Sequence, residues 1–233
     1  MSEYLLLWLE APLQSWGADS KFYRRDTLPF PTKSGVTGML FAGSGLAGEQ
    51  VELLLLMSTL TQTVFSYRGK NQKGPISSRL EDFQMVGSGY DETDAWQSLH
   101  IPKTAEGKRA VGGGTKLTYR YYLQDKKFAV IVEVPNQLVE TFSEGLMNPV
   151  FDLFLGRKNC IPTDFVFRGV FASSDEAESM AKKIADEKEL VEEFRVVDGP
   201  DERGDVSVLQ DVPLRFDRNK LYTGREVSVI KNI

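Results

Sequence analysis

The chain has 233 residues, enough for one large domain or two closely packed halves. Hydrophobic residues make up 41% and charged residues 26%, as in ordinary folded globular proteins, which excludes a wholly disordered chain. Cys160 is the only cysteine, so an internal disulfide and a thiolate metal cluster are excluded and a reducing cytoplasm is expected. No stretch approaches the roughly 18 consecutive apolar residues that span a bilayer, so no membrane association is expected.

The net charge of −5 is unevenly distributed. The segment 174–205 holds twelve acidic and five basic residues, so the rest of the chain carries a small positive excess. The segment is interpreted as a solvated face, with a surface for a protein partner as the alternative. Basic residues outside it form two clusters, which suit nucleic-acid phosphates but are also typical of an ordinary charged surface. The clusters are Lys21, Arg24, Arg25 and Lys33, and Arg68, Lys70, Lys73 and Arg79.

The first half of the chain mixes strands and helices. Residues 4–9 are a continuous apolar run, typical of a strand that is covered on both faces. After Pro31, a Thr or Ser side chain can cap a helix. The segment 87–114 is polar and glycine-rich and predicts a long loop. The other predicted elements are a helix that begins at Thr32 or Ser34, a helix over 49–60, and strands over 61–67 and 80–86.

Two aromatic and apolar runs, 117–123 and 128–134, are separated by four polar residues and predict a β-hairpin. Because side chains alternate along a strand, about half of the tyrosines at 119, 121 and 122 should be buried. The remaining elements are a helix around 138–146, a loop over 155–163, a strand over 165–171, a helix from Ser174 or Asp175 to about Glu193, and strands over 206–209, 212–216 and 227–230. This order is a mixed α+β pattern compatible with a ferredoxin-like split βαβ sheet.

Motifs for catalysis or cofactor binding are weak. Gly43, Gly45 and Gly48 match a dinucleotide fingerprint, but Arg68 stands where an acidic residue would follow, so a tight connection is favoured. His100 is the only histidine, so a two-histidine ribonuclease site cannot be built, and it is interpreted as an exposed loop residue. No spacing typical of a metal site occurs. We therefore expect no catalytic residues, no cofactor and no metal.

Two segments suit single-stranded RNA. Residues 33–35 lie at a predicted helix start, where N–H groups, the helix dipole and a lysine favour a phosphate, although a well-capped helix has the same sequence. Residues 119–122 combine ring faces with a guanidinium, which suits stacked bases and phosphates. Arg157 and Lys158 follow a predicted helix end, where cations are favoured without any RNA.

Six segments, taken in their order, resemble the CasD-type subunits of the CRISPR Cascade complex, in the RAMP superfamily. They read LLLWLEAPLQSWG, FPTKSGVTGML, LEDFQMVGSG, TYRYYLQDKKFAV, FLGRKNCIPT and GREVSVIKN, and they span almost the whole chain. The LGRKNC block points to subtype I-E.

The resemblance implies a fold and a role. The fold is an RRM-like, ferredoxin-like RAMP domain over residues 1–155, with a β-hairpin thumb inserted at about 87–116, and a smaller β-rich C-terminal part with one helix over 156–233. The role is to hold the 5′ handle of the guide RNA (crRNA), to contact the backbone subunit (CasC type) and the large subunit (CasA type), and to interrupt guide pairing with target DNA through the thumb. The residues assigned to RNA are Arg24, Arg25, Lys33, Ser34, Gly35, Arg68, Gln84, Lys116, Tyr119, Arg120, Tyr121, Arg157 and Lys158.

Two alternatives stay open. A processing branch of the superfamily cleaves precursor RNA with a Tyr, Lys and His arrangement, from which this sequence departs because only His100 is available. A free-standing RRM-like regulator is disfavoured because no RNP-type aromatic strand occurs. In the favoured interpretation, Lys33→Glu and Arg120→Glu reduce guide-RNA retention and leave the isolated fold intact.

Overall fold

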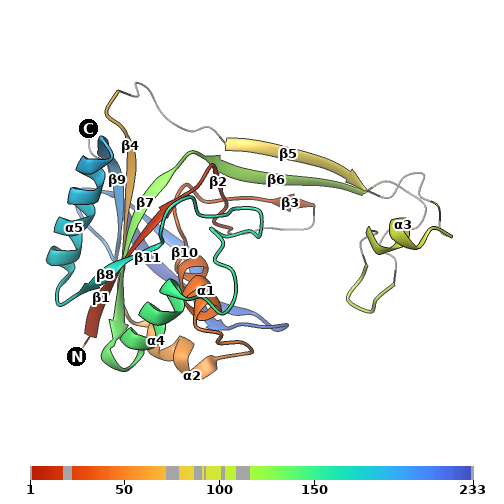
Figure 1. Cartoon of the computed structure of the whole chain (residues 1–233), viewed down its shortest axis with the longest axis horizontal. Coiled ribbons are helices and arrows are strands. Elements are labelled where there is room, and N and C mark those ends of the chain that lie inside the picture. Colours follow the sequence, from red (N-terminus) through yellow and green to blue (C-terminus); the bar gives the residue numbers. More distant parts are fainter. Residues whose placement is uncertain are drawn as a thin grey trace.

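The computed structural model describes residues 2–17, 23–71, 79–86, 91, 93–100, 103–108 and 116–231 (Figure 1). The strands are β1 (Ser2–Glu10), β2 (Leu13–Gln14), β3 (Arg24–Arg25), β4 (Gln62–Gly69), β5 (Arg79–Val86), β6 (Lys116–Gln124), β7 (Lys127–Pro135), β8 (Phe167–Phe171), β9 (Leu190–Asp198), β10 (Asp205–Arg215) and β11 (Leu221–Lys231). The helices are α1 (Lys33–Gly43), α2 (Val51–Ser58), α3 (Ala95–His100), α4 (Asn136–Met147) and α5 (Ser174–Glu187). Within these ranges no helix has the length and apolar character needed to cross a membrane.

Seven strands form one sheet in the order β10-β11-β9-β4-β7-β1-β8, with antiparallel neighbours. β1 lies between β7 and β8, and its side chains alternate between the two faces of the sheet. Leu5, Leu7 and Leu9 enter the core on one face, and Leu6 and Trp8 enter the core on the other. All five are fully buried, so the prediction of a strand covered on both faces is confirmed.

Helices cover both faces of this sheet (Figure 1). α1 and α4 pack together on one face, where the rings of Phe41 and Phe142 lie 5.9 Å apart. Their backbones approach so closely that a Cβ on Gly43 would lie 2.5 Å from the carbonyl oxygen of Gly145. Gly43 is thus required for helix packing. α5 packs on the other face through an apolar stripe in which Ala177 and Ala181 are fully buried.

β6 and β7 are strands as predicted, but the predicted hairpin between them is wrong. β7 pairs with β1 and β4, whereas β6 pairs with β5, β2 and β3 in a second sheet. Asp125, at φ 49°, turns the chain from one sheet into the other. Alternating strands joined by a short polar connection indicate a hairpin only if no other strand competes for their edges. Here β1 and β4 pair with β7, and β5 pairs with β6, so the edges needed for a hairpin are taken.

β5 and β6 form an antiparallel arm that projects from the body (Figure 1). The ladder runs from Arg79 opposite Leu123 to Val86 opposite Lys116, so it ends where the predicted thumb range 87–116 begins. Most of that range lies outside the described residues. Its described part contains α3, which the prediction of a continuous loop missed. The backbone of His100 ends α3, and its side chain lies outside what the structure describes.

The C-terminal residues extend the same sheet. The helix predicted to reach Glu193 ends at Glu187, and β9 follows after Glu189 at φ 56°. The strands predicted separately over 206–209 and 212–216 are one strand, β10, whose register with β11 shifts between Leu209 and Val212. Both predicted parts, 1–155 and 156–233, therefore contribute strands to one sheet.

Candidate nucleic-acid interface

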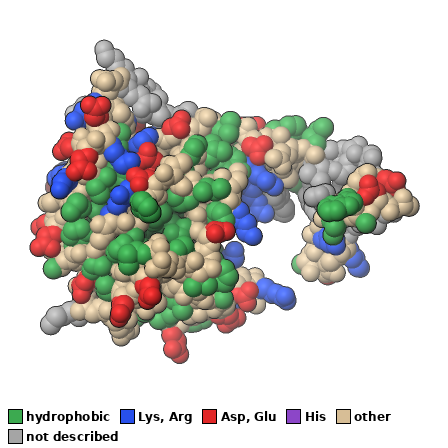
Figure 2. Space-filling view, in the orientation of Figure 1, with side chains coloured by type: hydrophobic (Ala, Val, Ile, Leu, Met, Phe, Trp, Pro, Cys, Tyr) green, Lys and Arg blue, Asp and Glu red, His purple; other side chains and the backbone are tan. Residues whose placement is uncertain are grey.

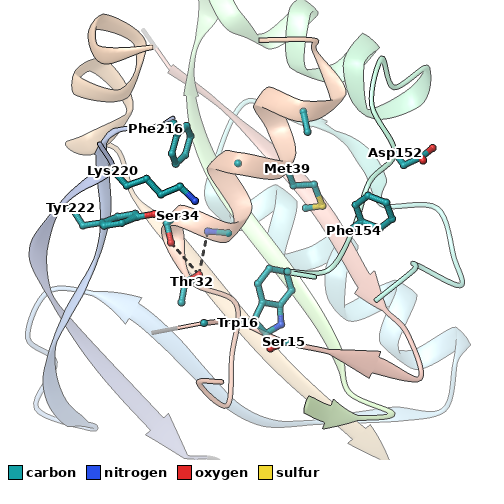
Figure 3. Close-up of a pocket in the computed structure, with 15 residues that line it drawn as sticks. Ser15, Trp16, Thr32, Ser34, Met39, Asp152, Phe154, Phe216, Lys220 and Tyr222 are labelled. Carbon is teal, nitrogen blue, oxygen red and sulfur yellow. Dashed lines mark hydrogen bonds between the residues drawn. The ribbon is translucent and has the colours of Figure 1, made fainter. Parts of the chain in front are cut away.

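The first turn of α1 rests on Trp16. Thr32 is the N-cap, and its Oγ1 accepts a hydrogen bond from the Gly35 N–H at 3.1 Å, as predicted for a capping residue. The Trp16 side chain is 1% exposed and lies directly beneath this turn (Figure 3). A Cβ on Gly35 would lie 2.9 Å from both the Trp16 ring and Thr32 Oγ1, so glycine allows this close contact.

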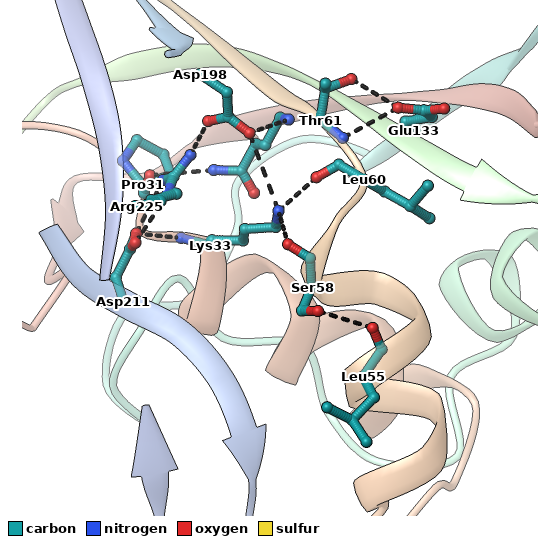
Figure 4. Close-up of polar contacts among 11 residues, drawn as sticks. Pro31, Lys33, Leu55, Ser58, Leu60, Thr61, Glu133, Asp198, Asp211 and Arg225 are labelled. Atoms are coloured by element: carbon teal, nitrogen blue, oxygen red, sulfur yellow. Dashed lines mark hydrogen bonds and ion pairs between the residues drawn. The ribbon is translucent and has the colours of Figure 1, made fainter. Parts of the chain in front are cut away.

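Lys33 does not face a ligand, contrary to the prediction. Its side chain is buried, and its Nζ donates to the carbonyl oxygens of Ser58, at 3.0 Å, and Leu60 (Figure 4). The Nζ also lies 3.9 Å from the Asp198 carboxylate. Burial lowers the pKa of Lys33, and the Asp198 charge opposes that shift. The Lys33 ammonium satisfies carbonyls at the end of α2 and is not available to a phosphate.

An acidic residue from β10 already caps α1. Asp211, 3% exposed, accepts a hydrogen bond from the Lys33 N–H at 2.7 Å. The Arg225 guanidinium holds the same carboxylate through two bonds of 2.8 and 2.9 Å and also pairs with Asp198. A carboxylate at the helix start satisfies the dipole that was predicted to attract a phosphate. The α1 start is thus a structural cap bound to β10 and β11.

A groove of about 330 Å³ runs along the outward side of α1 (Figure 3). We call it the α1 groove. Small residues of the helix, Gly35, Gly38 and Ala42, form part of its lining. Rings and two charged side chains stand around them: Phe154, Phe216 and Tyr222, the almost fully buried Trp16, and Lys220 and Asp152. The Lys220 side chain extends toward Ser34 in Figure 3. Ring faces beside an ammonium suit an unpaired nucleotide, whose base stacks and whose phosphate needs a cation.

Arg157 joins this groove to the base of the arm. Its Nη1 donates to the Tyr121 carbonyl at 3.2 Å, and its Nη2 donates to the Arg25 carbonyl at 2.8 Å. Its Cζ also lies 4.7 Å above the Tyr122 ring. The preceding Gly156 lines the α1 groove at φ 96°, where a Cβ would lie 1.7 Å from the Ser15 carbonyl oxygen. The groove and the arm base therefore meet at this loop.

Three cations beside this loop, Arg25, Arg120 and Lys158, form what we call the basic strip. β3 pairs with β6 in parallel, which places Arg25 next to Arg120. Lys158 is exposed on the loop. In the part of the chain that the structure describes, Arg25, Arg120 and Lys158 have no carboxylate within ion-pair distance, whereas Arg24 pairs with Asp26 at 4.0 Å. Figure 2 shows Lys and Arg side chains gathered beneath the arm, where β3 lies.

The tyrosines of β6 divide between two faces as predicted. Tyr122 is 2% exposed, and its hydroxyl accepts a hydrogen bond from Asn159 at 3.1 Å. Tyr119 and Tyr121 are half-buried on the opposite face, where the Tyr119 ring lies 5.2 Å from Phe83. Arg24 lies 4.7 Å above the Tyr121 ring. A hydrogen bond to Glu81 raises the pKa of Tyr121.

The structure brings together most of the predicted binding residues, with clear exceptions. Gln84 is exposed on the arm, and Arg68 lies at the end of β4 beside β9, apart from the strip (Figure 1). The Lys116 side chain lies outside the described residues. Sequence reasoning missed Phe216, Lys220 and Tyr222, because their approach to α1 depends on the β10–β11 pairing. The residues gathered at the α1 groove and the arm base are Arg24, Arg25, Ser34, Gly35, Tyr119, Arg120, Tyr121, Arg157 and Lys158.

Known proteins resemble the chain in sequence and in fold. The family model described as "CRISPR-associated protein (Cas_Cas5)" matches residues 4–227. The curated protein "CRISPR system Cascade subunit CasD" of Escherichia coli (strain K12) is 27% identical over 182 residues, which are 75% of this chain and 74% of that protein. A chain of a solved "CRISPR RNA-guided surveillance complex" superposes with a TM-score of 0.71 at 29% identity, over 98% of this chain and 90% of that one. A second structure, "Crystal structure of Cas protein", gives a TM-score of 0.59 at 25% identity, over 98% of this chain and 94% of that one.

The chain therefore belongs to the CRISPR-associated Cas5 family. The resemblance to CasD-type subunits predicted from the sequence is confirmed. In the described ranges no group of three or more His, Cys, Asp or Glu side chains is arranged to hold a metal ion.

Proposed function

We propose that the chain is the crRNA-binding subunit of a CRISPR Cascade surveillance complex and that it caps the 5′ handle of the guide RNA. The observation that carries this proposal is the continuity of the α1 groove with the basic strip through Gly156 and Arg157. A flexible strand can place a base in the groove while its neighbouring phosphates follow the cations of the arm base.

The energetics favour an unpaired strand. Stacking of one base on an aromatic ring contributes about 1–3 kcal/mol, and it tolerates many sequences. Phosphate contacts by Arg25, Arg120 and Lys158 add a salt-dependent attraction. The net charge of −5 does not oppose this, because acidic side chains concentrate on α5, across the sheet from α1.

We assign a ferredoxin-like core to the chain. The adjacent strands β8-β1-β7-β4 are antiparallel, and α1 and α4 connect them on one face, which supports this assignment. The projecting β5–β6 arm is then the thumb that interrupts guide pairing with target DNA. In this proposal the partners are a CasC-type backbone subunit and a CasA-type large subunit.

The proposal is tested with labelled guide RNA and charge-reversed variants. Arg120→Glu and Lys220→Glu should each weaken binding in fluorescence anisotropy. Loss of one phosphate contact should also lower the slope of log affinity against log salt by about 0.7. Lys183→Glu is the matched control, because Lys183 is exposed on α5 across the sheet. Unchanged affinity in both site variants would overturn the proposal.

We propose that binding occurs without cleavage. The test is incubation of the chain with a repeat-containing RNA, followed by analysis of the products on a gel. Intact RNA is the expected result. Specific cleavage that is lost in His100→Ala would instead establish the endoribonuclease alternative.

A further inference from the structure

An exposed apolar groove lies beside the α1 groove. It has a volume of about 470 Å³ and lies between the end of α4 and the loop that leads to β8; we call it the Phe165 groove. Three large apolar side chains on it are unusually exposed: Met147 at 59%, Ile161 at 63% and Phe165 at 82%. Such side chains clustered around one depression are typical of a surface that binds another molecule. Figure 2 shows hydrophobic side chains gathered on the face of the body over which this loop runs in Figure 1.

The exposed phenylalanine is held rigidly. The Phe165 N–H donates to Asp164 Oδ1 at 2.7 Å, and the Asp164 carboxylate is bound by Arg168 at 2.6 Å and Lys188 at 2.8 Å. On its other side, the carbonyl of Val166 accepts a hydrogen bond from the Trp8 N–H of β1 at 2.7 Å. A side chain that is presented by a fixed backbone loses little conformational entropy on binding. The loop therefore displays Phe165 in a form ready to enter a partner.

The charges of the groove select the occupant. Its ionisable lining residues are Asp152 and Asp164, and among the described residues no Lys or Arg lines it. Asp164 is already paired with Arg168 and Lys188, so Asp152 carries the uncompensated charge of the groove. Asp152 is exposed, and among the described residues it has no ion-pair partner. Between residues 128 and 156 the sequence contains four acidic residues and no basic one. Carboxylates repel the phosphates of RNA and of anionic lipid, whereas they attract Lys and Arg beside an apolar anchor.

The acidic face of α5 and β9 is less suited to a partner. Several of its carboxylates are bound within the chain: Glu178 pairs with Lys182 at 2.8 Å and with Arg195 at 3.2 Å, and Arg195 also pairs with Glu192 at 2.7 Å. Carboxylates that are already paired gain little from a new ionic partner. This favours the solvated interpretation of that face.

We infer that the Phe165 groove docks another protein, through an apolar segment of that protein flanked by Lys or Arg. The inference rests on the proposed function in one respect, namely that the partner is a protein subunit of the same RNA-guided complex. Continuity supports this, because Asp152 and Phe154 line both the Phe165 groove and the α1 groove. A protein seated here would lie directly beside the RNA.

Photocrosslinking in the assembled complex identifies the occupant. The chain, with p-benzoylphenylalanine in place of Phe165, is co-expressed with CasC-type and CasA-type subunits and guide RNA, purified and irradiated. We expect a crosslink to a peptide of one of those subunits that contains apolar residues and Lys or Arg. A matched probe replaces Val208, which is 63% exposed on β10, and should not crosslink to that peptide. A crosslink of the Phe165 probe to RNA, a crosslink to a second copy of the chain, or no crosslink would each overturn the inference.

Variants test the contribution of the groove to assembly. Phe165→Glu and Ile161→Glu should reduce the amount of partner subunit retained by the tagged chain at least tenfold, with an unchanged unfolding midpoint because both side chains are exposed. Val208→Glu is the control and should retain the partner. Wild-type retention by both groove variants would overturn the inference.

The RNA affinity of the isolated chain, measured in parallel, separates this inference from the proposed function. If the wild-type chain binds RNA but the groove variants still assemble, the docking inference alone fails. If the wild-type chain binds no RNA, but the groove variants retain less partner subunit than the wild-type chain when both samples are treated with nuclease, the proposed function alone fails.

Discussion

Replacement of Arg225 by alanine should destabilise the fold strongly. The Arg225 side chain is 10% exposed and binds Asp211 and Asp198, whose side chains are 3% and 20% exposed. Removal of one partner from a buried ion pair typically costs about 3–5 kcal/mol, because the remaining charge is left uncompensated. The Lys33 ammonium, 3.9 Å from Asp198, still offsets part of that charge, so we expect a loss near the lower limit.

Equilibrium unfolding in urea measures this loss directly. For a chain of this size, about 3 kcal/mol corresponds to a fall of about 6–12 °C in Tm. The matched control is Arg203→Ala, because Arg203 also pairs with an aspartate, at 2.6 Å, but its side chain is 74% exposed. This control should leave the free energy of unfolding unchanged.

A double-mutant cycle distinguishes the ion pair from simple loss of packing. Asp211→Ala removes the carboxylate that caps α1 and leaves Arg225 paired with Asp198. The double variant should lose less stability than the sum of the two single variants, because neither partner of the Arg225–Asp211 pair remains uncompensated. Additive losses, or a loss below about 1 kcal/mol for Arg225→Ala, would refute the reasoning.

Three further predictions follow from buried or strained positions. Burial by itself would raise the pKa of Glu10, but hydrogen bonds from Trp8 and Lys188 lower it below 4.5. The Glu10 carboxylate therefore stabilises the fold above about pH 4.5, and this stabilisation is lost on acidification. Glu10→Gln should therefore flatten the decline in unfolding free energy below pH 4.5 in urea titrations, and a decline as steep as that of the wild type would count against the assignment. Gly156→Ala should lower both Tm and RNA affinity, because its Cβ would overlap the Ser15 carbonyl; wild-type values of both would show that the loop can move aside. Lys33→Glu should prevent stable folding, since it places a carboxylate beside two carbonyls and Asp198, whereas Lys33→Met should fold. Circular dichroism and thermal unfolding distinguish these outcomes. A stable Lys33→Glu chain would contradict the burial of the Lys33 side chain.

The last prediction reverses an expectation from the sequence. A lysine just after a capping threonine was expected to face a phosphate, and its reversal to glutamate was expected to leave the fold intact. Asp211, 178 residues away, accepts the Lys33 N–H, and the carbonyls at the end of α2 accept its ammonium. No local pattern indicates that these groups converge on one side chain.

The sequence by itself determined the properties that depend on near neighbours. An unbroken apolar run specified that β1 is covered on both faces, a Thr or Ser after Pro31 specified the start of α1, and alternation along β6 specified that its tyrosines divide between a buried and an open face. Burial patterns and caps are encoded within a few residues, because they follow from backbone geometry and side-chain polarity. The family was also readable, from short segments distributed along the chain.

The tertiary structure decided which elements become neighbours. β6 leaves β7 to pair with β5, and the β10–β11 hairpin brings Lys220 and Tyr222 to α1, where they complete the α1 groove. The exposure of Phe165 was likewise invisible in the sequence, since an apolar residue before a strand is usually buried. These outcomes depend on competition among distant strands and charges for the same partners, and that competition is resolved only when the whole chain packs.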